Sequence, residues 1–410
     1  MKRSFLLLFF IIPLLSFAST IEVCKSCKIN TITAAIALAK DGDSILVNKG
    51  VYKEHNVILI NKSVSIIGVG NPVIDGENKE TVLKVKANNF SIEGFTIINV
   101  GQSYTKDFAA ILVSRSQRFT IKNNIFKNIF FGILVEKSHY GTISNNILTS
   151  DATSEASAGN GIHLWHCSNM TVENNDLSFL RDGIYFEFVS ESIVTNNMSY
   201  NNIRYGLHFM FSNKNEYHNN TFKNNGSGVA VMFSKYVKMT GNKFIYNWGT
   251  ASYGLLLKEI YDAEIENNLF EQNTIGINIE GSTRINYKKN TFNRNGWAVK
   301  IRGACYENVF IHNNFLSNAF DLSYNSKINS NLFDKNYWSE YTGYDLDKDG
   351  YGDVPFRPVK LFSYIVNQTP ETIVLLRSLF IDIINFSEKV SPVFTPDKLV
   401  DNAPLMRKVQ

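Results

Sequence analysis

A recurring asparagine pair constrains the fold of this 410-residue chain more than any other feature. The pattern, related to Asn-Asn-x-Phe/Leu and indexed by its second Asn, recurs at Asn124, Asn146, Asn175, Asn197, Asn220, Asn242, Asn268, Asn290, Asn314 and Asn331. Most units are 22 to 24 residues long, two have 29 and 26 residues, and the last has 17. A period near 22 residues over so many units predicts a solenoid.

Each unit has room for about three short strands of period-2 alternation and shows no helical stripe. The expected fold is therefore all-β, a right-handed parallel β-helix in which each strand bonds to its copy one coil later. Three positions before each indexed Asn lies an apolar or aromatic residue, from Ile121 to Ile311, and we expect this column to face inward. The chain contains 49 Asn. Asn tolerates left-handed backbone angles and its stacked amides bond along the axis, so we interpret the repeated Asn residues as structural.

The repeat divides the chain into five predicted parts. A short capping helix is expected over 32–39, because the open end of a solenoid exposes unpaired strand edges. The parts are a signal peptide over 1–18, an N-terminal cap with the first coils over 19–100, regular coils over 101–335, an Asp-rich capping loop over 336–358, and a C-terminal helix and tail over 359–410.

The first 18 residues have the features of an export signal. Lys2 and Arg3 precede an apolar run, and the small residues Ser16 and Ala18 fit a cleavage site after Ala18. We therefore expect a periplasmic mature protein that contacts the membrane only through a partner. The chain has 41 Lys and Arg against 37 Asp and Glu and no basic stripe, which disfavours nucleic-acid binding.

The residues that alternate with the inward ones form two outward columns on successive coils. The first column is Leu134, His163, Tyr185, His208, Ala230, Leu256 and Asn278. The second column is Glu136, Trp165, Glu187, Met210, Met232, Lys258 and Glu280. The two longest units insert residues 150–159 and 248–253 at one corner, where they would wall a shallow cleft. Because insertions on one face of a solenoid often mark its binding side, the sequence predicts a partner face at His163, Trp165, Tyr185 and Glu187.

His208, Met210 and Met232 lie close enough in this pattern to share one metal ion. Adjacent rungs are ~4.8 Å apart, and alternate residues of one strand are ~7 Å apart. An imidazole with two thioethers is a soft ligand set that suits Cu(I) and suits Mg²⁺ or Ca²⁺ poorly. The alternative is an aromatic and Met surface that packs against a partner protein.

An acidic loop near the end of the repeat has the pattern of a calcium loop. Asp345, Asp347, Asp349 and Asp353 alternate around Gly350, which lets hard oxygen ligands converge on one Ca²⁺ ion. Position twelve is Phe356 where an EF-hand has Glu. An Asp-rich turn that caps the solenoid without an ion is therefore the alternative.

The cysteines fit an oxidising compartment. Cys24 and Cys27 lie near the mature N-terminus, where a local disulfide is favoured over a terminal metal clip. Cys167 and Cys305 are too far apart in coil number to pair.

The tail leaves the repeat after Pro358. Thr369 and Pro370 have the pattern of a helix start, and the apolar segment 373–386 follows, interrupted by Arg377 and Asp382. This amphipathic helix would either plug the solenoid or present an apolar ridge to a membrane partner.

The signal peptide, the Asn-rich repeats and the tail together resemble the NosD family of periplasmic accessory proteins in nitrous oxide reductase maturation. The most specific part is the block Asn336-Tyr337-Trp338-Ser339-Glu340-Tyr341, joined through the Asp loop to Asp353-x-Pro355-Phe356-Arg357. The resemblance covers nearly the whole mature chain. It implies a protein without enzymatic activity that works with an ABC-type permease and its ATPase, a copper chaperone and the nitrous oxide reductase apoprotein.

A polysaccharide lyase, hydrolase or epimerase on the same fold is the alternative function, and a passive adhesin is a third. Such enzymes need grouped carboxylates, or a basic residue near a Ca²⁺ cluster, on one exposed strand face. The outward columns offer one central carboxylate, Glu187, and Arg181 with Asp182 forms an isolated pair before Gly183. The sequence therefore favours a binding protein.

Overall fold

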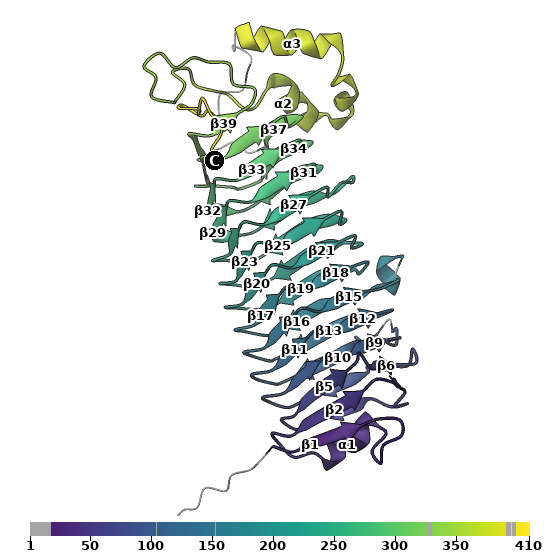
Figure 1. Cartoon of the computed structure of the whole chain (residues 1–410). Coiled ribbons are helices and arrows are strands. Elements are labelled where there is room, and N and C mark those ends of the chain that lie inside the picture. Colours follow the sequence, from purple (N-terminus) through teal and green to yellow (C-terminus); the bar gives the residue numbers. More distant parts are fainter. Residues whose placement is uncertain (1–17, 104, 152, 326–329, 391–394, 396–398) are drawn as a thin grey trace, which may run out of the picture.

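The computed structural model describes residues 18–410 except 104, 152, 326–329, 391–394 and 396–398. Residues 1–17 of the predicted signal peptide lie outside the described residues. The strands wind into a straight rod, with α1 (Ile32–Leu38) at one end and two further helices at the other (Figure 1). Among the described helices, none has the length and apolar character needed to cross a bilayer.

Three parallel sheets form the walls of the rod. Sheet A has 14 strands from β1 (Thr20–Val23) to β38 (Leu332–Asp334), and sheet B has 13 strands from β3 (Val51–Tyr52) to β39 (Tyr337–Trp338). Sheet C has 12 strands and runs from β4 (Ile58–Ile60) to β37 (Phe320–Tyr324). At ~4.8 Å per coil the rod is roughly 60 Å long. The predicted parallel β-solenoid is confirmed, and the three sheets continue without a break across residue 100.

One coil passes through sheet C, then sheet A, then sheet B. In the coil that begins with β19 (Asp182–Glu187), β20 (Ile193–Thr195) lies in sheet A and β21 (Met198–Tyr200) in sheet B. The strands of sheet C that matter below are β10 (Ala109–Ser114), β13 (Phe131–Glu136), β16 (Ile162–Trp165), β19, β22 (Tyr205–Met210), β25 (Ser227–Met232), β28 (Tyr253–Lys258), β31 (Ile275–Glu280), β34 (Trp297–Arg302) and β37 (Phe320–Tyr324).

The two residues of an Asn pair have different structural roles at the corner between sheets A and B. The first adopts a left-handed backbone, as Asn145 does with a φ of 54°. The second is buried and joins the amide ladder, in which Asn146 Nδ2 donates to Asn175 Oδ1 at 3.0 Å. The pair recurs because the corner needs one residue that tolerates positive φ and one that bonds along the axis.

The last two indexed Asn positions predicted from the sequence are wrong. Asn290 donates to Asn313, and Asn313 donates to Asn336, so the ladder does not continue through Asn314 and Asn331. Asn331 instead accepts from Asn308 in a second ladder at another corner. The inward residue of that coil is therefore Phe310, which is fully buried, rather than Ile311. The run His312-Asn313-Asn314 allowed two registers, and only the hydrogen bonds between coils distinguish them.

The C-terminal end of the rod is closed by the chain that follows the helices. Asp401 is fully buried and takes the place of the next ladder residue, with Oδ2 accepting from Asn336 Nδ2 at 3.1 Å and from Trp338 Nε1 at 3.0 Å. Leu405 bridges to Tyr337, and Asn314 Nδ2 donates to the Val409 carbonyl oxygen. The last residues therefore cap the core of the solenoid.

The predicted tail helix over 373–386 is wrong in its boundaries. The tail forms α2 (Leu361–Gln368), a 3₁₀ turn η2 (Pro370–Leu375) and α3 (Leu379–Val390). Phe362, Val366 and Ile381 pack in one buried cluster with the first residues of three sheet C strands, Ile275, Trp297 and Phe320. The helices thus cover the side of the last coils, while Asp401 and its neighbours close the end.

Candidate functional site

The strand register aligns the residues of the two predicted columns of sheet C, but five members of the first column are buried: Leu134, His208, Ala230, Leu256 and Asn278. His163 pairs with Tyr185, Tyr185 with His208, and Met210 with Met232. The first insertion contains η1 (Glu155–Ser157) and precedes β16, and the second precedes β28. Both insertions therefore lie at the corner between sheets B and C, and η1 projects from the side of the rod in Figure 1. The shallow cleft that they would wall stays a prediction.

An ion pair with a buried carboxylate lies at the start of these strands, where the sequence had indicated only an isolated Arg181 and Asp182. Asp182 is 0% exposed, and its Oδ2 lies 3.0 Å from Nη2 of Arg204 in the next coil. Its Oδ1 accepts from the backbone N–H of Tyr205. Arg181 turns away and donates from Nε to Asn160 Oδ1 at 3.2 Å. The sequence gives Arg204 no distinctive signal, because the pairing depends on the register between coils.

This ion pair holds the ring of His208. Arg204 Nη2 lies 3.2 Å from His208 Nδ1, and Asp182 Oδ2 lies 3.6 Å from the same nitrogen. An arginine only donates hydrogen bonds, so the closer contact makes Nδ1 an acceptor and leaves the proton of a neutral ring on Nε2. His208 is buried, and its Nε2 has no hydrogen-bond partner among the described residues.

A row of rings connects His208 to the coils before it. Ring centroids are 4.8 Å apart for Tyr185 and His208, 4.6 Å for His163 and Tyr185, and 5.9 Å for Phe131 and His163. Burial, with the nearby Arg181 charge, lowers the pKa of His163 to about 3, so its ring is neutral at pH 7. Burial and then the Glu187 and Asp182 charges raise the pKa of Tyr185 to about 12.

The other end of the same strands carries an apolar and aromatic surface. Met210 and Met232 are half-buried on adjacent rungs, and Met210 Sδ lies 3.9 Å from Tyr185 Oη. The structure thus places His208, Met210 and Met232 on two neighbouring coils, as predicted. Their sharing of one copper ion stays a prediction.

Beside the methionines runs a ladder of exposed rings that the sequence analysis missed. We call it the Phe ladder; its members are His166, Phe188, Phe211 and Phe233. Neighbouring centroids are 4.6, 5.2 and 5.1 Å apart, and each residue adopts a positive φ. The signal was available, because each Phe directly follows a residue of the second outward column.

The Asp loop brings three of its four predicted ligands together. One carboxylate oxygen each from Asp345, Asp347 and Asp349 lies within 4.8 Å of the others. Asp353 lies outside this group and accepts from the backbone N–H of Leu346 at 2.7 Å. Binding of Ca²⁺ stays a prediction.

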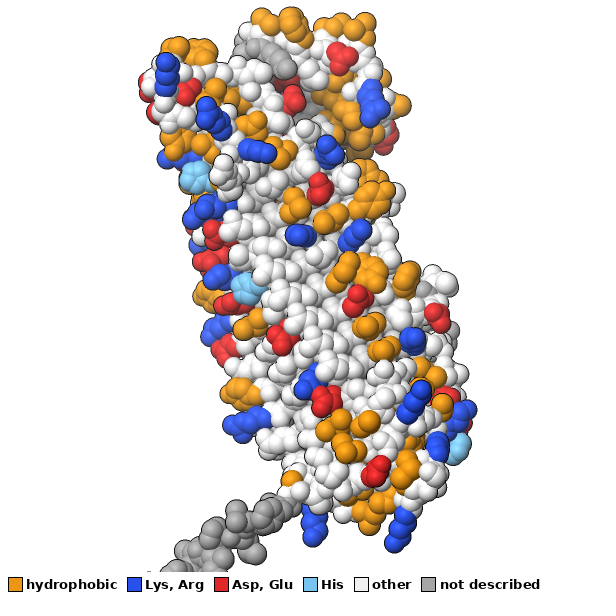
Figure 2. Space-filling view, viewed as in Figure 1, with side chains coloured by type: hydrophobic (Ala, Val, Ile, Leu, Met, Phe, Trp, Pro, Cys, Tyr) orange, Lys and Arg blue, Asp and Glu red, His pale blue; other side chains and the backbone are white. Residues whose placement is uncertain are grey.

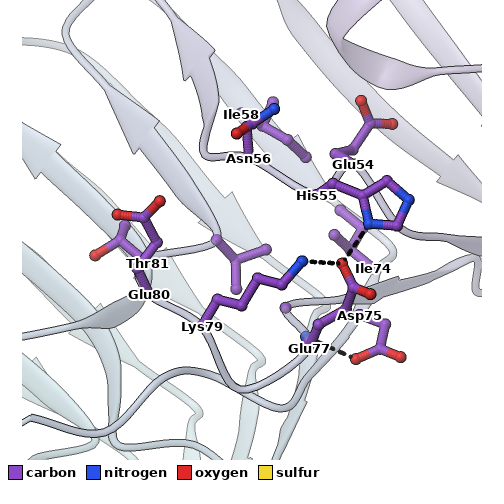
Figure 3. Close-up of a pocket in the computed structure, with 12 residues that line it drawn as sticks. Glu54, His55, Asn56, Ile58, Ile74, Asp75, Glu77, Lys79, Glu80 and Thr81 are labelled. Carbon is purple, nitrogen blue, oxygen red and sulfur yellow. Dashed lines mark hydrogen bonds and ion pairs between the residues drawn. The ribbon is translucent and has the colours of Figure 1, made fainter.

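The four cysteines form one disulfide and two free thiols. Cys24 and Cys27 form a disulfide, while Cys167 and Cys305 are buried free thiols. A small cavity of about 20 Å³ lies near the N-terminal end, where Figure 3 shows the side chains around Glu77. It has room for about one water molecule. We do not assign it a role.

An apolar ridge projects from α3. Leu379, Phe380 and Phe386 are 74%, 61% and 68% exposed, while Ile381 on the opposite side of the helix is buried against the rod. Figure 2 shows hydrophobic side chains gathered at this end of the molecule.

The chain is a parallel β-solenoid in which alternate residues of sheet C form aligned columns. Solved structures with the same fold include a family 28 exopolygalacturonase of Yersinia enterocolitica, with a TM-score of 0.60 and 12% identity over 77% of this chain and 78% of that one. The surface adhesin PfbA of Streptococcus pneumoniae has a TM-score of 0.53 and 14% identity over 74% and 86%. At these identities the likeness shows the fold alone.

Sequence comparison shows which family the chain is similar to. The model of the family described as "Periplasmic copper-binding protein (NosD)" matches residues 148–345. Two proteins named "Probable ABC transporter binding protein NosD" are each 26% identical to this chain, one from Stutzerimonas stutzeri over 82% of this chain and 80% of its own length, and one from Pseudomonas aeruginosa over 82% of both. The chain is therefore similar to NosD proteins over most of its length.

Proposed function

We propose that this chain is a periplasmic copper-binding partner of an ABC transporter, without enzymatic activity, that acts in the maturation of nitrous oxide reductase. The family description and the names of the two relatives support the copper and transporter parts. The observation that carries the proposal is the pair of half-buried thioethers, Met210 and Met232, facing outward on adjacent coils.

The copper ligands are ordered by how free they are to bind. Met210 and Met232 have soft sulfur atoms on an open face, and thioethers favour Cu(I) over Zn²⁺ or Ca²⁺. His208 binds copper through Nε2 only after that nitrogen loses its proton, which requires Nδ1 to take a proton and give up its contact with Arg204. We therefore assign the thioethers as primary ligands and His208 as a third ligand.

The polysaccharide enzymes remain the alternative, and the engagement of Asp182 argues against them. General acid–base chemistry on sugars needs a carboxyl group that reaches the substrate. Both oxygens of Asp182 are already bound, one by Arg204 and one by the backbone of Tyr205. Glu187 remains the central carboxylate of the outward columns, as the sequence indicated, whereas such enzymes need grouped carboxylates.

The ridge on α3 is the proposed contact with the permease of the transporter. Side chains as exposed as Leu379, Phe380 and Phe386 on one helix face are unusual for a surface that stays in water. The copper chaperone and the reductase apoprotein would then use the partner face around Trp165, Tyr185 and the Phe ladder, some distance along the rod. Copper would pass between proteins on that face while the transporter holds the end.

Copper binding is tested by titrating purified protein with Cu(I) against a chromogenic chelator. The double variant Met210→Ala, Met232→Ala is expected to lose at least about tenfold in Cu(I) affinity, because both soft ligands are gone. Met198→Ala removes an exposed methionine from sheet B and is the matched control. Unchanged Cu(I) affinity in the double variant would refute the ligand assignment.

Transporter docking is tested by co-purification with the permease and its ATPase from cells that express all three proteins. Phe380→Asp with Phe386→Asp is expected to abolish co-purification without unfolding the rod, because both side chains are exposed. Leu59→Asp places the same charge on an exposed apolar position at the other end of sheet C. Retained co-purification of the α3 variant would show that the permease binds elsewhere.

A further inference from the structure

Five buried polar atoms have no hydrogen-bond partner among the described residues and lie on the coils of β16 and β22, on either side of β19. They are Asn160 Nδ2, His163 Nδ1, His163 Nε2, Arg204 Nε and His208 Nε2. The described part of the chain contains ten such side-chain atoms, so half of them lie at this one place on the rod. Buried polar groups are nearly always paired with protein or water, and such a concentration points to something that binds there.

Most of these atoms donate hydrogen bonds. Asn160 Nδ2 and Arg204 Nε are donors, and His208 Nε2 carries the ring proton because Nδ1 accepts from Arg204. The neutral ring of His163 adds one donor and one acceptor. The nearest carboxylate, Asp182, is already engaged by Arg204 and by the Tyr205 N–H. The group therefore lacks acceptors.

The charges around this group are of both signs. Arg181 and Arg204 are positive and Asp182 is negative, while the negative Glu187 acts on Tyr185 and the negative Glu155 acts on Tyr205. The donor excess, rather than the net charge, therefore favours a ligand that accepts hydrogen bonds. The ring centroids of Tyr185 and Tyr205 lie 4.8 Å from that of His208 and provide apolar walls beside the donors, and the proposal requires one of these rings to turn before a ligand can reach His208 Nε2.

We propose that Asn160, His163, Arg204 and His208 form a binding site for a small carboxylate ligand on sheet C. The carboxylate oxygens accept from the amide, the guanidinium and the imidazoles, and the tyrosine rings pack against the carbon skeleton. Charge-assisted hydrogen bonds of this kind are the stronger ones in proteins. The site lies around β16 and β22, whereas the primary copper ligands Met210 and Met232 lie at the strand ends. The two proposals share His208 Nε2, which donates to the carboxylate while it carries the ring proton and is free for copper only without that proton.

Calorimetric titration of the purified full chain with acetate, galacturonate and inorganic phosphate tests this site. Acetate and galacturonate are expected to bind, and tighter binding of galacturonate would identify an acidic sugar rather than a simple acid as the source of the carboxylate. Phosphate binding without carboxylate binding would overturn the assignment. Failure of all three probes, with ordered water on the five atoms in a crystal structure, would show a hydration site only.

Two variants connect the binding to these residues. His163→Phe keeps a ring between Phe131 and Tyr185 but removes both nitrogens, and we expect at least fivefold weaker carboxylate binding in a protein that stays folded. Arg204→Gln should weaken binding at least tenfold, whereas Arg302→Gln, another ion-paired arginine at the edge of sheet C, should change it less than twofold. Unchanged binding in His163→Phe would overturn the proposal.

One variant distinguishes a failure of the copper proposal from a failure of the carboxylate proposal. Met210→Ala with Met232→Ala is expected to leave carboxylate affinity within twofold of wild type, because neither thioether is part of the donor group. A carboxylate site that disappears in this variant would mean that both observations describe one site, and the separate carboxylate assignment would be wrong.

Discussion

The central and the C-terminal coils of sheet C share an inward face but differ at the starts of their strands. The central strands β19 and β22 begin with Asp182 and Tyr205, whereas β31, β34 and β37 begin at the same register with Ile275, Trp297 and Phe320. The tail helices cover the apolar set, whereas the central coils keep buried polar atoms without partners among the described residues. The same solenoid core therefore tolerates either polar or apolar residues where its strands begin.

Sheet A shows a third use of the outward face. Oppositely charged side chains pair between coils, such as Lys122 with Glu93 at 2.9 Å and Arg284 with Asp262 at 2.6 Å, and charged groups follow the corresponding edge in Figure 2. Exposed pairs of this kind contribute little to stability. The charged groups of these pairs already have partners, whereas half of the unpartnered buried polar atoms among the described residues lie at sheet C between Asn160 and His208, which is why we place the function on sheet C.

The largest effect is expected where the chain end closes the rod over the covered coils. Asp401→Ala leaves the buried donors of Asn336 and Trp338 without an acceptor, at about 1–3 kcal/mol each, so unfolding free energy should fall by about 4 kcal/mol. Asp401→Asn keeps an acceptor and continues the Asn ladder, and most of that stability should remain. Urea denaturation measures both. Equal losses in the two variants would show that charge matters rather than the missing acceptor.

The second largest effect on stability is expected for the tail helices that pack over the last coils of sheet C. Phe362→Ala removes a ring that packs with Trp297 and Phe320, and a buried Phe→Ala change costs about 3 kcal/mol. On the central coils, Tyr185→Phe should change stability by less than about 1 kcal/mol, because only a hydroxyl is removed. Thermal denaturation compares the two. A negligible loss in Phe362→Ala would mean that the tail is not a stable cover.

A medium effect depends on pH and belongs to the central coils. Unfolded His163 titrates near 6.5, and burial lowers its folded pKa to about 3. Between these values the unfolded chain binds more protons, so stability is full above pH 6.5 and falls as the pH drops toward 3. We expect this residue to remove about 2 kcal/mol between pH 7 and pH 5.

The control for this pH effect is His163→Phe, which has no titrating ring. Denaturation of both proteins at pH 7 and pH 5 should show a smaller loss in the variant by about 2 kcal/mol. An identical pH dependence in the two proteins would show that His163 is accessible to protons in the folded state.

The smallest effect is expected on the Phe ladder. Phe211 adopts a φ of 48°, which costs a non-glycine residue roughly 1–2 kcal/mol, and its stacking on Phe188 and Phe233 returns a similar amount. Phe211→Asn should therefore change unfolding free energy by less than about 1 kcal/mol. A loss above about 2 kcal/mol would show that the ladder serves folding rather than binding.

The repeat made most of the fold predictable. The period, the inward apolar column and the outward columns of His163, Tyr185 and His208 all follow from strand alternation, and the register between coils agrees with them. The prediction chose Asn314 where the ladder uses Asn313, because these two adjacent asparagines fit the pattern equally well, and it chose Asn331, which belongs to a ladder at another corner, in place of Asn336. A repeat pattern cannot assign the register between coils where two neighbouring residues fit it equally well.

The sequence by itself determined the parallel β-solenoid, because a side chain every second residue and a corner every coil leave one way to bury the apolar columns. The tertiary structure alone decided which polar groups meet. The pairing of Asp182 with Arg204, the tautomer of His208, the capping of the ladder by Asp401 and the cover over Trp297 join residues from different coils or from the tail. These contacts depend on side-chain directions across coils, and no periodicity along the chain encodes them.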